Sequence, residues 1–304
     1  MSHVRVGTRA SRLAIEQTRQ VTSLLERAGH TVEWVSMHTQ GDRVLDRALN
    51  QIGDKGLFTA ELEEALLDGR VDMAVHSLKD LPTELAPGLR IGAYTLPVDR
   101  RDVLLSEGIS LPLLPSGAVI GTSSLRRAAF LKAVRPDIVV TPVRGNLETR
   151  VEKWRGQPMN GLILAAAGVV RLGWQELITQ YLDPHRIVPA PGQGILAIEV
   201  ASLRTDLDQI LERLNERRAR DVGIAERAVL HQLGGGCQVP LGAYAEWIDR
   251  EHLHLVAQVA SLDGQVVLRE EADFRASEGW MLGSRLGDKL RGRGALQLIE
   301  TAQG

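Results

Sequence analysis

The stretch "VIGTSSLRRAAFL" (residues 119–131) contains the unit from which most of this chain is built. A short apolar run ends at a glycine, three hydroxyl residues follow, and a segment with helical spacing of apolar residues comes next. This is the pattern of a buried strand, a turn and a helix. The same pattern recurs in VRVGT with a helix over 11–28, TVEWVSM with 57–68, DIVVTPV with 146–155, and LILAAAG with a helix over roughly 169–181. The first two-thirds of the chain is therefore predicted to form α/β layers.

The last third has a different pattern. Residues 251–274 contain two alternating apolar runs around Asp263-Gly264, which predicts a β-hairpin. A helical stretch follows near 277–292, so we expect a small antiparallel α+β domain. Before it, the prolines and glycines of "VPAPGQGILAIEV" (188–200) mark a break ahead of another strand, which predicts a crossing between domains.

Composition excludes several classes of protein. A chain of 304 residues, 44% hydrophobic and 24% charged, predicts a soluble protein of two or three domains. No run approaches the ~18 apolar residues that a membrane-spanning helix needs. The N-terminus has no apolar signal segment and the chain has one cysteine, so we expect a cytoplasmic protein. A net charge of −2 gives no reason to expect a nucleic-acid or membrane partner.

Arginine stands at four strand-to-helix junctions. In "GTRASRLA" (7–14) we expect a strand to end at Gly7 and Ser11 to cap the next helix, with Arg9 beside the free N–H groups. The other junctions carry Arg126 and Arg127, then Arg144 and Arg150 around the candidate cap Asn146, then Arg171. Together they predict a cleft for a ligand with many negative charges. The pattern does not separate carboxylates from phosphates, but it includes no GxxxxGK[ST] or GxGxxG nucleotide motif.

An acidic residue lies in the same setting. In "DMAVHSLKDLP" (72–82) a strand over Met73 to His76 is followed by Ser77, Lys79 and Asp80. An acid beside a base at a strand end is often only a turn with a salt bridge. In a cationic cleft, however, a carboxylate repels an anionic ligand unless it has a chemical task, such as proton transfer or stabilisation of a developing cation. Asp80 is therefore the predicted catalytic residue.

The only cysteine, Cys237, follows three glycines in "LGGGCQVPLGAY" (233–244). A lone cysteine is often an inert buried side chain. Three glycines, however, leave no side chains to pack and let a ligand approach the backbone closely. From these residues alone, a cysteine hydrolase and a solute-binding protein both remain open. The first leaves the arginines unexplained, and the second leaves Asp80 and the thiol unexplained.

Eight motifs occur in one order along the chain. They are "TRASRLA" (8–14), "GDKGLF" (53–58), "AVHSLKDLP" (74–82), "GTSSLRR" (121–127), "RGNLETR" (144–150), "AAAGVVRLG" (165–173), "PAPGQG" (189–194) and "LGGGCQVPLGAY". Over about four-fifths of its length the chain resembles the porphobilinogen deaminase family, also called hydroxymethylbilane synthases. The resemblance implies an enzyme of tetrapyrrole biosynthesis that joins four porphobilinogen molecules head to tail, releases ammonia each time, and frees hydroxymethylbilane by hydrolysis.

The resemblance also implies a covalent cofactor and no metal. Cys237 would carry a dipyrromethane through a thioether, and Asp80 would hydrogen-bond pyrrole N–H groups, stabilise the cationic azafulvene and assist proton removal. The residues implied to hold the cofactor are Ser77, Lys79, Asp80, Thr122, Ser124, Arg126, Arg127, Arg144 and Gly145. Those implied to hold substrate or the growing chain are Arg9, Ser11, Gln17, Lys55, Phe58, Arg144, Arg150, Arg171 and Gln193, with Lys55 and Phe58 in a lid loop.

The family fold implied is three domains in one monomer. Two are doubly wound α/β lobes like those of periplasmic binding proteins, and the third is the α+β domain with the cysteine loop. The expected bounds are 1–96 with 194–214 for the first domain, 100–190 for the second, and 217–304 for the third.

Overall fold

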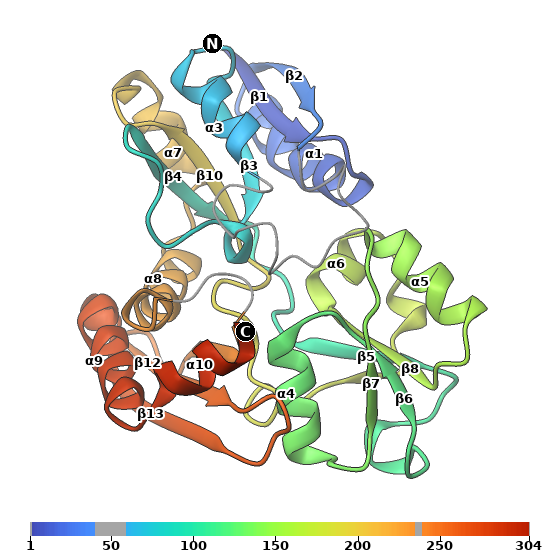
Figure 1. Ribbon diagram of the computed structural model, residues 1–304. Coiled ribbons are helices and arrows are strands. Elements are labelled where there is room, and N and C mark those ends of the chain that lie inside the picture. Colours follow the sequence, from blue (N-terminus) through green and yellow to red (C-terminus); the bar gives the residue numbers. More distant parts are fainter. Residues whose placement is uncertain (1, 40–58, 235–238, 304) are drawn as a thin grey trace.

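The computed structural model describes residues 2–39, 59–234 and 239–303. Within these ranges the strands form two five-stranded sheets and one three-stranded sheet, which belong to the three bodies visible in Figure 1. The α/β class with a C-terminal α+β part is thereby confirmed.

The first lobe is built on a sheet with strand order β2-β1-β3-β10-β4. Strand β1 pairs in parallel with β2 and β3, whereas β10 is antiparallel to β3 and β4. The apolar residues of β1 and β3 are fully buried, as expected of central strands covered on both faces. The elements are β1 (His3–Arg9), α1 (Arg12–Arg27), β2 (Thr31–Met37), α3 (Ala60–Leu67), β3 (Met73–Ser77), β4 (Leu89–Thr95), β10 (Leu196–Ala201) and α7 (Asp208–Leu214).

The second lobe repeats this plan in the order β7-β6-β8-β5-β9. Strand β6 is parallel to β7 and β8, and β5 is antiparallel to β8 and β9. Strand β5 follows residues 96–101, which lead out of the first lobe, and β10 follows residues 182–195, which lead out of the second. These two segments, called the crossings below, join the two lobes. The elements are β5 (Asp102–Ser106), β6 (Val119–Gly121), α4 (Leu125–Val134), β7 (Val139–Thr141), α5 (Leu147–Gly156), β8 (Gly161–Ala165), α6 (Ala166–Arg171) and β9 (Gln180–Tyr181).

Two local predictions were wrong. The helix expected over roughly 169–181 is instead the short α6, which ends before Gly173 because that glycine has φ +74° and breaks the helix. Residues 180–181 then form strand β9, which pairs with β5. Strand β1 does not end at Gly7 but continues to Arg9, because its parallel register with β2 runs through the pair Arg9 and Met37.

The C-terminal part is an antiparallel sheet β11-β12-β13 covered by helices. The predicted hairpin around Asp263-Gly264 is confirmed, with Ala260 paired to Val267 and Gly264 at φ +74° in the turn. This core is not separate from the first lobe, since Leu78 and Leu81 lie in the same apolar cluster as Ala225. The elements are α8 (Arg217–Gln232), β11 (Leu241–Trp247), β12 (His252–Ala260), β13 (Val267–Arg275), α9 (Gly279–Gly292) and α10 (Ala295–Gln303).

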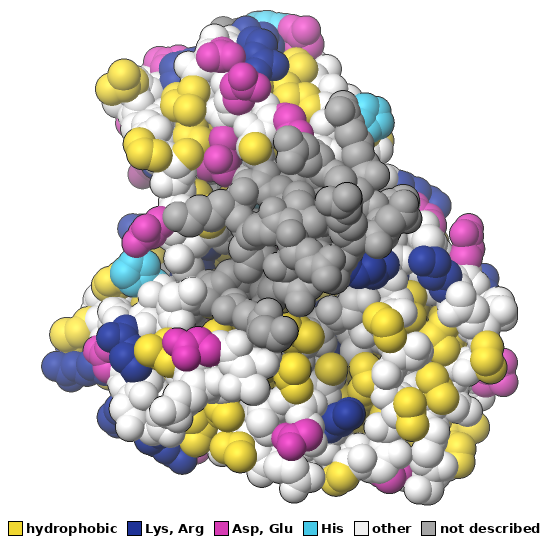
Figure 2. Space-filling model, viewed as in Figure 1, with side chains coloured by type: hydrophobic (Ala, Val, Ile, Leu, Met, Phe, Trp, Pro, Cys, Tyr) yellow, Lys and Arg dark blue, Asp and Glu magenta, His cyan; other side chains and the backbone are white. Residues whose placement is uncertain are grey.

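The surface carries mixed charge. On the face shown in Figure 2, basic and acidic side chains are interspersed with apolar ones, in keeping with a net charge of −2. None of the helices in the described ranges combines the length and the apolar character needed to cross a membrane.

Candidate active site

Asp80 lies in a 3₁₀ turn, Leu78–Asp80, that directly follows β3. The backbone N–H of Leu78 donates to the carbonyl of Ile195 at 2.9 Å, which extends the β3–β10 pairing into the turn. The hydroxyl of Ser77 accepts a hydrogen bond from Gln17 Nε2 at 2.9 Å. The turn therefore presents Ser77, Lys79 and Asp80 together at the end of a central strand, as predicted.

Lys79 connects this turn to the crossing between the lobes. Its Nζ donates to Gln193 Oε1 at 3.3 Å. Burial is the main cause that lowers the pKa of Lys79 to about 8. The charge of Asp80 opposes this shift, and that of Arg127 adds to it. An anionic group close by would stabilise the charged form of this buried ammonium and raise its pKa.

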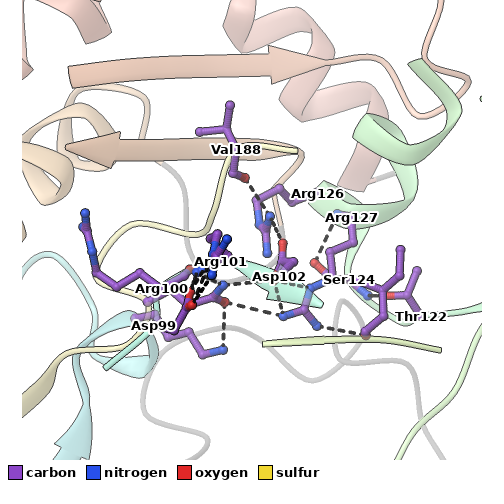
Figure 3. A network of polar contacts seen from close by, with 12 residues as sticks. Asp99, Arg100, Arg101, Asp102, Thr122, Ser124, Arg126, Arg127 and Val188 are labelled. Atoms are coloured by element: carbon purple, nitrogen blue, oxygen red, sulfur yellow. Dashed lines mark hydrogen bonds and ion pairs between the residues drawn. The ribbon is translucent and has the colours of Figure 1, made fainter. Parts of the chain in front are cut away.

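A buried carboxylate, Asp102, organises the second lobe's side of the site (Figure 3). It has no exposed surface and accepts hydrogen bonds from Arg126 Nη1 at 2.7 Å and from Arg127 Nε and Nη2 at 3.0 and 2.8 Å. Gln193 Nε2 donates to it at 2.9 Å. Burial alone would raise the pKa of Asp102, but the two guanidiniums hold it far below its usual range.

Asp102 explains why two arginines stand in the first turn of α4, where a helix N-terminus disfavours cations. Ser124 caps this helix by accepting from the Arg127 N–H at 3.4 Å, and Thr122 Oγ1 accepts from the Ser124 N–H at 3.2 Å. Arg126 also donates to the carbonyl of Val188 at 2.7 Å. Its guanidinium is therefore bound both to Asp102 of the second lobe and to the segment that leads back to the first lobe. Sequence reasoning missed Asp102, although an acid that opens the apolar run "DVLLS" behind two arginines was a usable signal.

The α5 junction brings further cations to the same place. Asn146 caps α5 by accepting from the Thr149 N–H at 2.9 Å, as predicted. Gly145 has φ +113°, and Arg150 Nε donates to its carbonyl at 2.8 Å. Burial lowers the pKa of Arg150 to about 10, with Arg127 and Arg144 adding to the shift and Asp80 opposing it. Arg150 of the second lobe and Asp80 of the first therefore lie within electrostatic reach of each other.

Arg171 contacts both crossings between the lobes. Its Nη2 donates to the carbonyl of Leu96 at 2.9 Å and to that of Gly194 at 3.2 Å. Burial lowers its pKa to about 10, and its Nε is buried without a hydrogen-bond partner among the described residues. Leu96 has φ +44°, a left-handed conformation uncommon for a side chain of this kind. The sequence pointed to Arg171 as a site residue but not to this contact with the crossings.

The remaining predicted residues fall into two groups. Arg9 is half-buried at the end of β1, and Ser11 caps α1 by accepting from the Ala14 N–H at 3.4 Å. Cys237, Lys55 and Phe58 lie outside the described residues.

Comparison with known proteins gives full-length matches. A family model described as "Porphobilinogen deaminase, dipyromethane cofactor binding domain" matches residues 4–209, and one described as "Porphobilinogen deaminase, C-terminal domain" matches residues 222–292. The porphobilinogen deaminase of Syntrophomonas wolfei is 48% identical over 302 residues, which cover 98% of each chain. That of Desulfitobacterium hafniense is 46% identical over 303 residues, covering 99% of this chain and 97% of its own.

Likeness to solved structures is more distant. A periplasmic substrate-binding protein of an ABC transporter from Coxiella burnetii aligns with a TM-score of 0.43 and 14% identity, covering 73% of this chain and 96% of its own. With a TM-score this low, the fold assignment rests on the sheet topology described above. The two family models and the full-length relatives decide the family: this chain belongs to the porphobilinogen deaminases.

Proposed function

We propose that the region around Asp80, at the end of β3, is the site at which this porphobilinogen deaminase joins four porphobilinogen molecules head to tail. Ammonia leaves at each condensation, and the linear hydroxymethylbilane is freed by hydrolysis. One observation carries the assignment of the site: the charge of Asp80 acts on both Lys79 of the first lobe and Arg150 of the second, two cations whose pKa is lowered by burial.

The charges in this region suit a ligand with several carboxylates. In the described part of the chain, five cations and two carboxylates act on one another here: Lys79, Arg126, Arg127, Arg144 and Arg150, with Asp80 and Asp102. Each porphobilinogen unit carries an acetate and a propionate, so every added unit brings two negative charges. A dipyrromethane with four carboxylates fits this set of donors, and it would offset the cost of holding these cations together.

We assign the holding of this cofactor to residues of both lobes. When bound, the dipyrromethane supplies the free pyrrole carbon to which the first substrate is joined. Cys237 is proposed as its thioether attachment. The residues proposed to bind its carboxylates and pyrrole N–H groups, Gly145 through its backbone, are Ser77, Lys79, Asp80, Thr122, Ser124, Arg126, Arg127, Arg144 and Gly145. Because Asp102 already accepts from Arg126 and Arg127, it would orient their remaining N–H groups.

Substrate and the growing chain would be bound by a second set of residues that overlaps the first. The proposed residues are Arg9, Ser11, Gln17, Lys55, Phe58, Arg144, Arg150, Arg171 and Gln193. The Asp80 carboxylate would accept a hydrogen bond from the substrate's pyrrole N–H and stabilise the positive charge that develops as ammonia departs. It would then assist removal of the proton displaced by the new carbon–carbon bond.

The domain bounds proposed are 1–96 with 194–214, 100–190, and 217–304. Support for the split first domain comes from β10, which pairs with β3 and β4, and from α7, which packs against β4. We further propose a cytoplasmic monomer, as the family resemblance suggests.

Intact mass and turnover test the function together. After incubation with porphobilinogen, the denatured chain should exceed its calculated mass by two linked pyrroles, and Cys237→Ser should lack this excess. Asp80→Asn should keep the added mass and lose most turnover, by about 10²-fold or more for a lost acid–base group. A wild-type chain that never gains mass would refute the attachment, and full turnover by Asp80→Asn would refute the role of Asp80.

A further inference from the structure

The turn that carries Asp80 is held from outside its own lobe. Arg227 lies on α8 and is 6% exposed. Its Nη1 donates to the carbonyl of Leu81 at 3.0 Å, and its Nη2 donates to those of Pro82 and Thr83 at 2.6 and 3.3 Å. One guanidinium thus binds three successive carbonyls, beginning at the residue after Asp80.

These contacts complete a two-sided support for Asp80. On its N-terminal side, β3 pairs with β10, and the Leu78 N–H donates to Ile195. On its C-terminal side, the support comes from Arg227. Because Asp80 is one peptide unit from the Leu81 carbonyl, its backbone cannot rotate freely while that carbonyl is bound.

Apolar packing joins the same turn to the same helix. Leu78 and Leu81 are essentially unexposed and lie in one cluster with Ala225 and Val229 of α8. Gly223 of α8 lies against Leu78, since a Cβ at this glycine would be 2.7 Å from Leu78 Cδ2. Helix α8 therefore packs closely against the turn, with the hydrogen bonds of Arg227 beside the apolar contact between Gly223 and Leu78.

We propose that Arg227 is a positioning residue for the Asp80 carboxylate, an inference that rests on the proposed role of Asp80. Arg227 need not touch substrate. It sets the orientation of the Leu78–Asp80 turn, and through it the direction in which the Asp80 carboxylate points. A misplacement of about 1 Å at a catalytic group can cost about 10²-fold in rate, so a clamp on this turn affects turnover more than binding.

A purely structural role makes a different prediction, and the chain offers a matched control. Arg135 likewise donates to two backbone carbonyls, those of Leu111 and Leu114, but it lies at the far end of α4 and is paired with Asp137. If Arg227 only satisfied buried carbonyls, Arg227→Met and Arg135→Met would both lower the free energy of unfolding, and both would keep the kcat of the wild type.

The test compares Arg227→Met, Arg227→Lys, Arg135→Met and Asp80→Asn in the cofactor-bearing enzyme. We expect Arg227→Met to keep the covalent mass of two pyrroles, to lower kcat by about 10- to 10²-fold, and to change KM by less than about threefold. Arg227→Lys, which keeps a charged donor, should recover part of kcat. Amide hydrogen exchange over residues 76–85 should speed up in Arg227→Met and not in Arg135→Met.

The outcomes separate this inference from the function beneath it. Full turnover by Asp80→Asn overturns the role of Asp80 and the inference with it. Loss of turnover in Asp80→Asn, together with equal kcat in the two Arg→Met variants, overturns the inference alone. If Arg227→Met does not fold, Arg227→Lys replaces it, because an ammonium group cannot bind the three carbonyls with the planar geometry of a guanidinium. A wild-type kcat in that variant, with wild-type amide exchange over residues 76–85, overturns the proposal.

Discussion

Removing the charge of Asp102 should cost more stability than removing that of any exposed carboxylate of similar pairing. Asp102→Asn keeps the shape of the side chain but leaves the buried guanidiniums of Arg126 and Arg127 without their counter-charge. Breaking a buried ion pair by neutralising one partner costs ~3–5 kcal/mol. Because Asp102 has no exposed surface, solvent screening does not reduce this figure. We expect the unfolding free energy at neutral pH to fall by that amount.

Urea denaturation followed by circular dichroism measures the change, with Asp206→Asn as the control. Asp206 is paired with Arg204 on the surface, where such a pair contributes less than about 1 kcal/mol. Equal losses in the two variants would refute the reasoning. The pH dependence gives a second check: the folded pKa of Asp102 lies below its unfolded value of ~3.9, so its contribution is complete above that pH and is lost as the pH falls below it. Asp102→Asn should lack this part of the acid destabilisation.

Two further predictions concern the candidate active site. Because burial lowers the pKa of Lys79 to about 8, its positive charge is lost as the pH rises through that value. Above that pH, apo-protein should therefore acquire the mass of two pyrroles more slowly. Lys79→Arg should remove this pH dependence, and a variant with the wild-type pH profile would contradict the prediction. Gly145→Ala places a side chain at φ +113° and a Cβ 2.7 Å from Thr149. Thermal denaturation should therefore show that the free energy of unfolding falls by at least about 1 kcal/mol. Gly156→Ala, where a Cβ would meet open space, should not show this loss.

The shared strand order of the two lobes gives the crossings their importance. In each lobe the antiparallel strand comes directly after the chain has crossed from the other lobe. The chain crosses at 96–101, before β5, and again before β10. Groups from elsewhere hold these segments: Arg171 binds the carbonyls of Leu96 and Gly194, and Glu226 of α8 accepts from the Gly192 N–H at 2.7 Å and from Arg100 at 2.6 Å. Helix α8 therefore contacts both a crossing and the turn that carries Asp80.

Local sequence determined the units of this fold. Apolar runs followed by helical spacing predicted α1, α4 and α5, with Ser11 and Asn146 as caps, because strand burial and helix capping depend on neighbouring residues. Asp263-Gly264 predicted its hairpin for the same reason. The helix over 169–181 was wrong for two reasons. Gly173 ends α6 locally, and residues 180–181 form β9 by pairing with β5, a partner more than seventy residues away. No local period carries that information.

The charged residues around Asp80 show the same division. Their number and placement at strand ends were readable from the sequence, since the ends of neighbouring strands meet at one edge of a sheet. Which of them remain available to a ligand was decided by distant partners: Asp102 binds Arg126 and Arg127, the crossings bind Arg171, and α8 supplies Arg227 to the turn of Asp80. Sequence determined which charges this protein brings to the ends of its strands, and only the tertiary structure decided how each is paired, because an ion pair depends on distance in space and not along the chain.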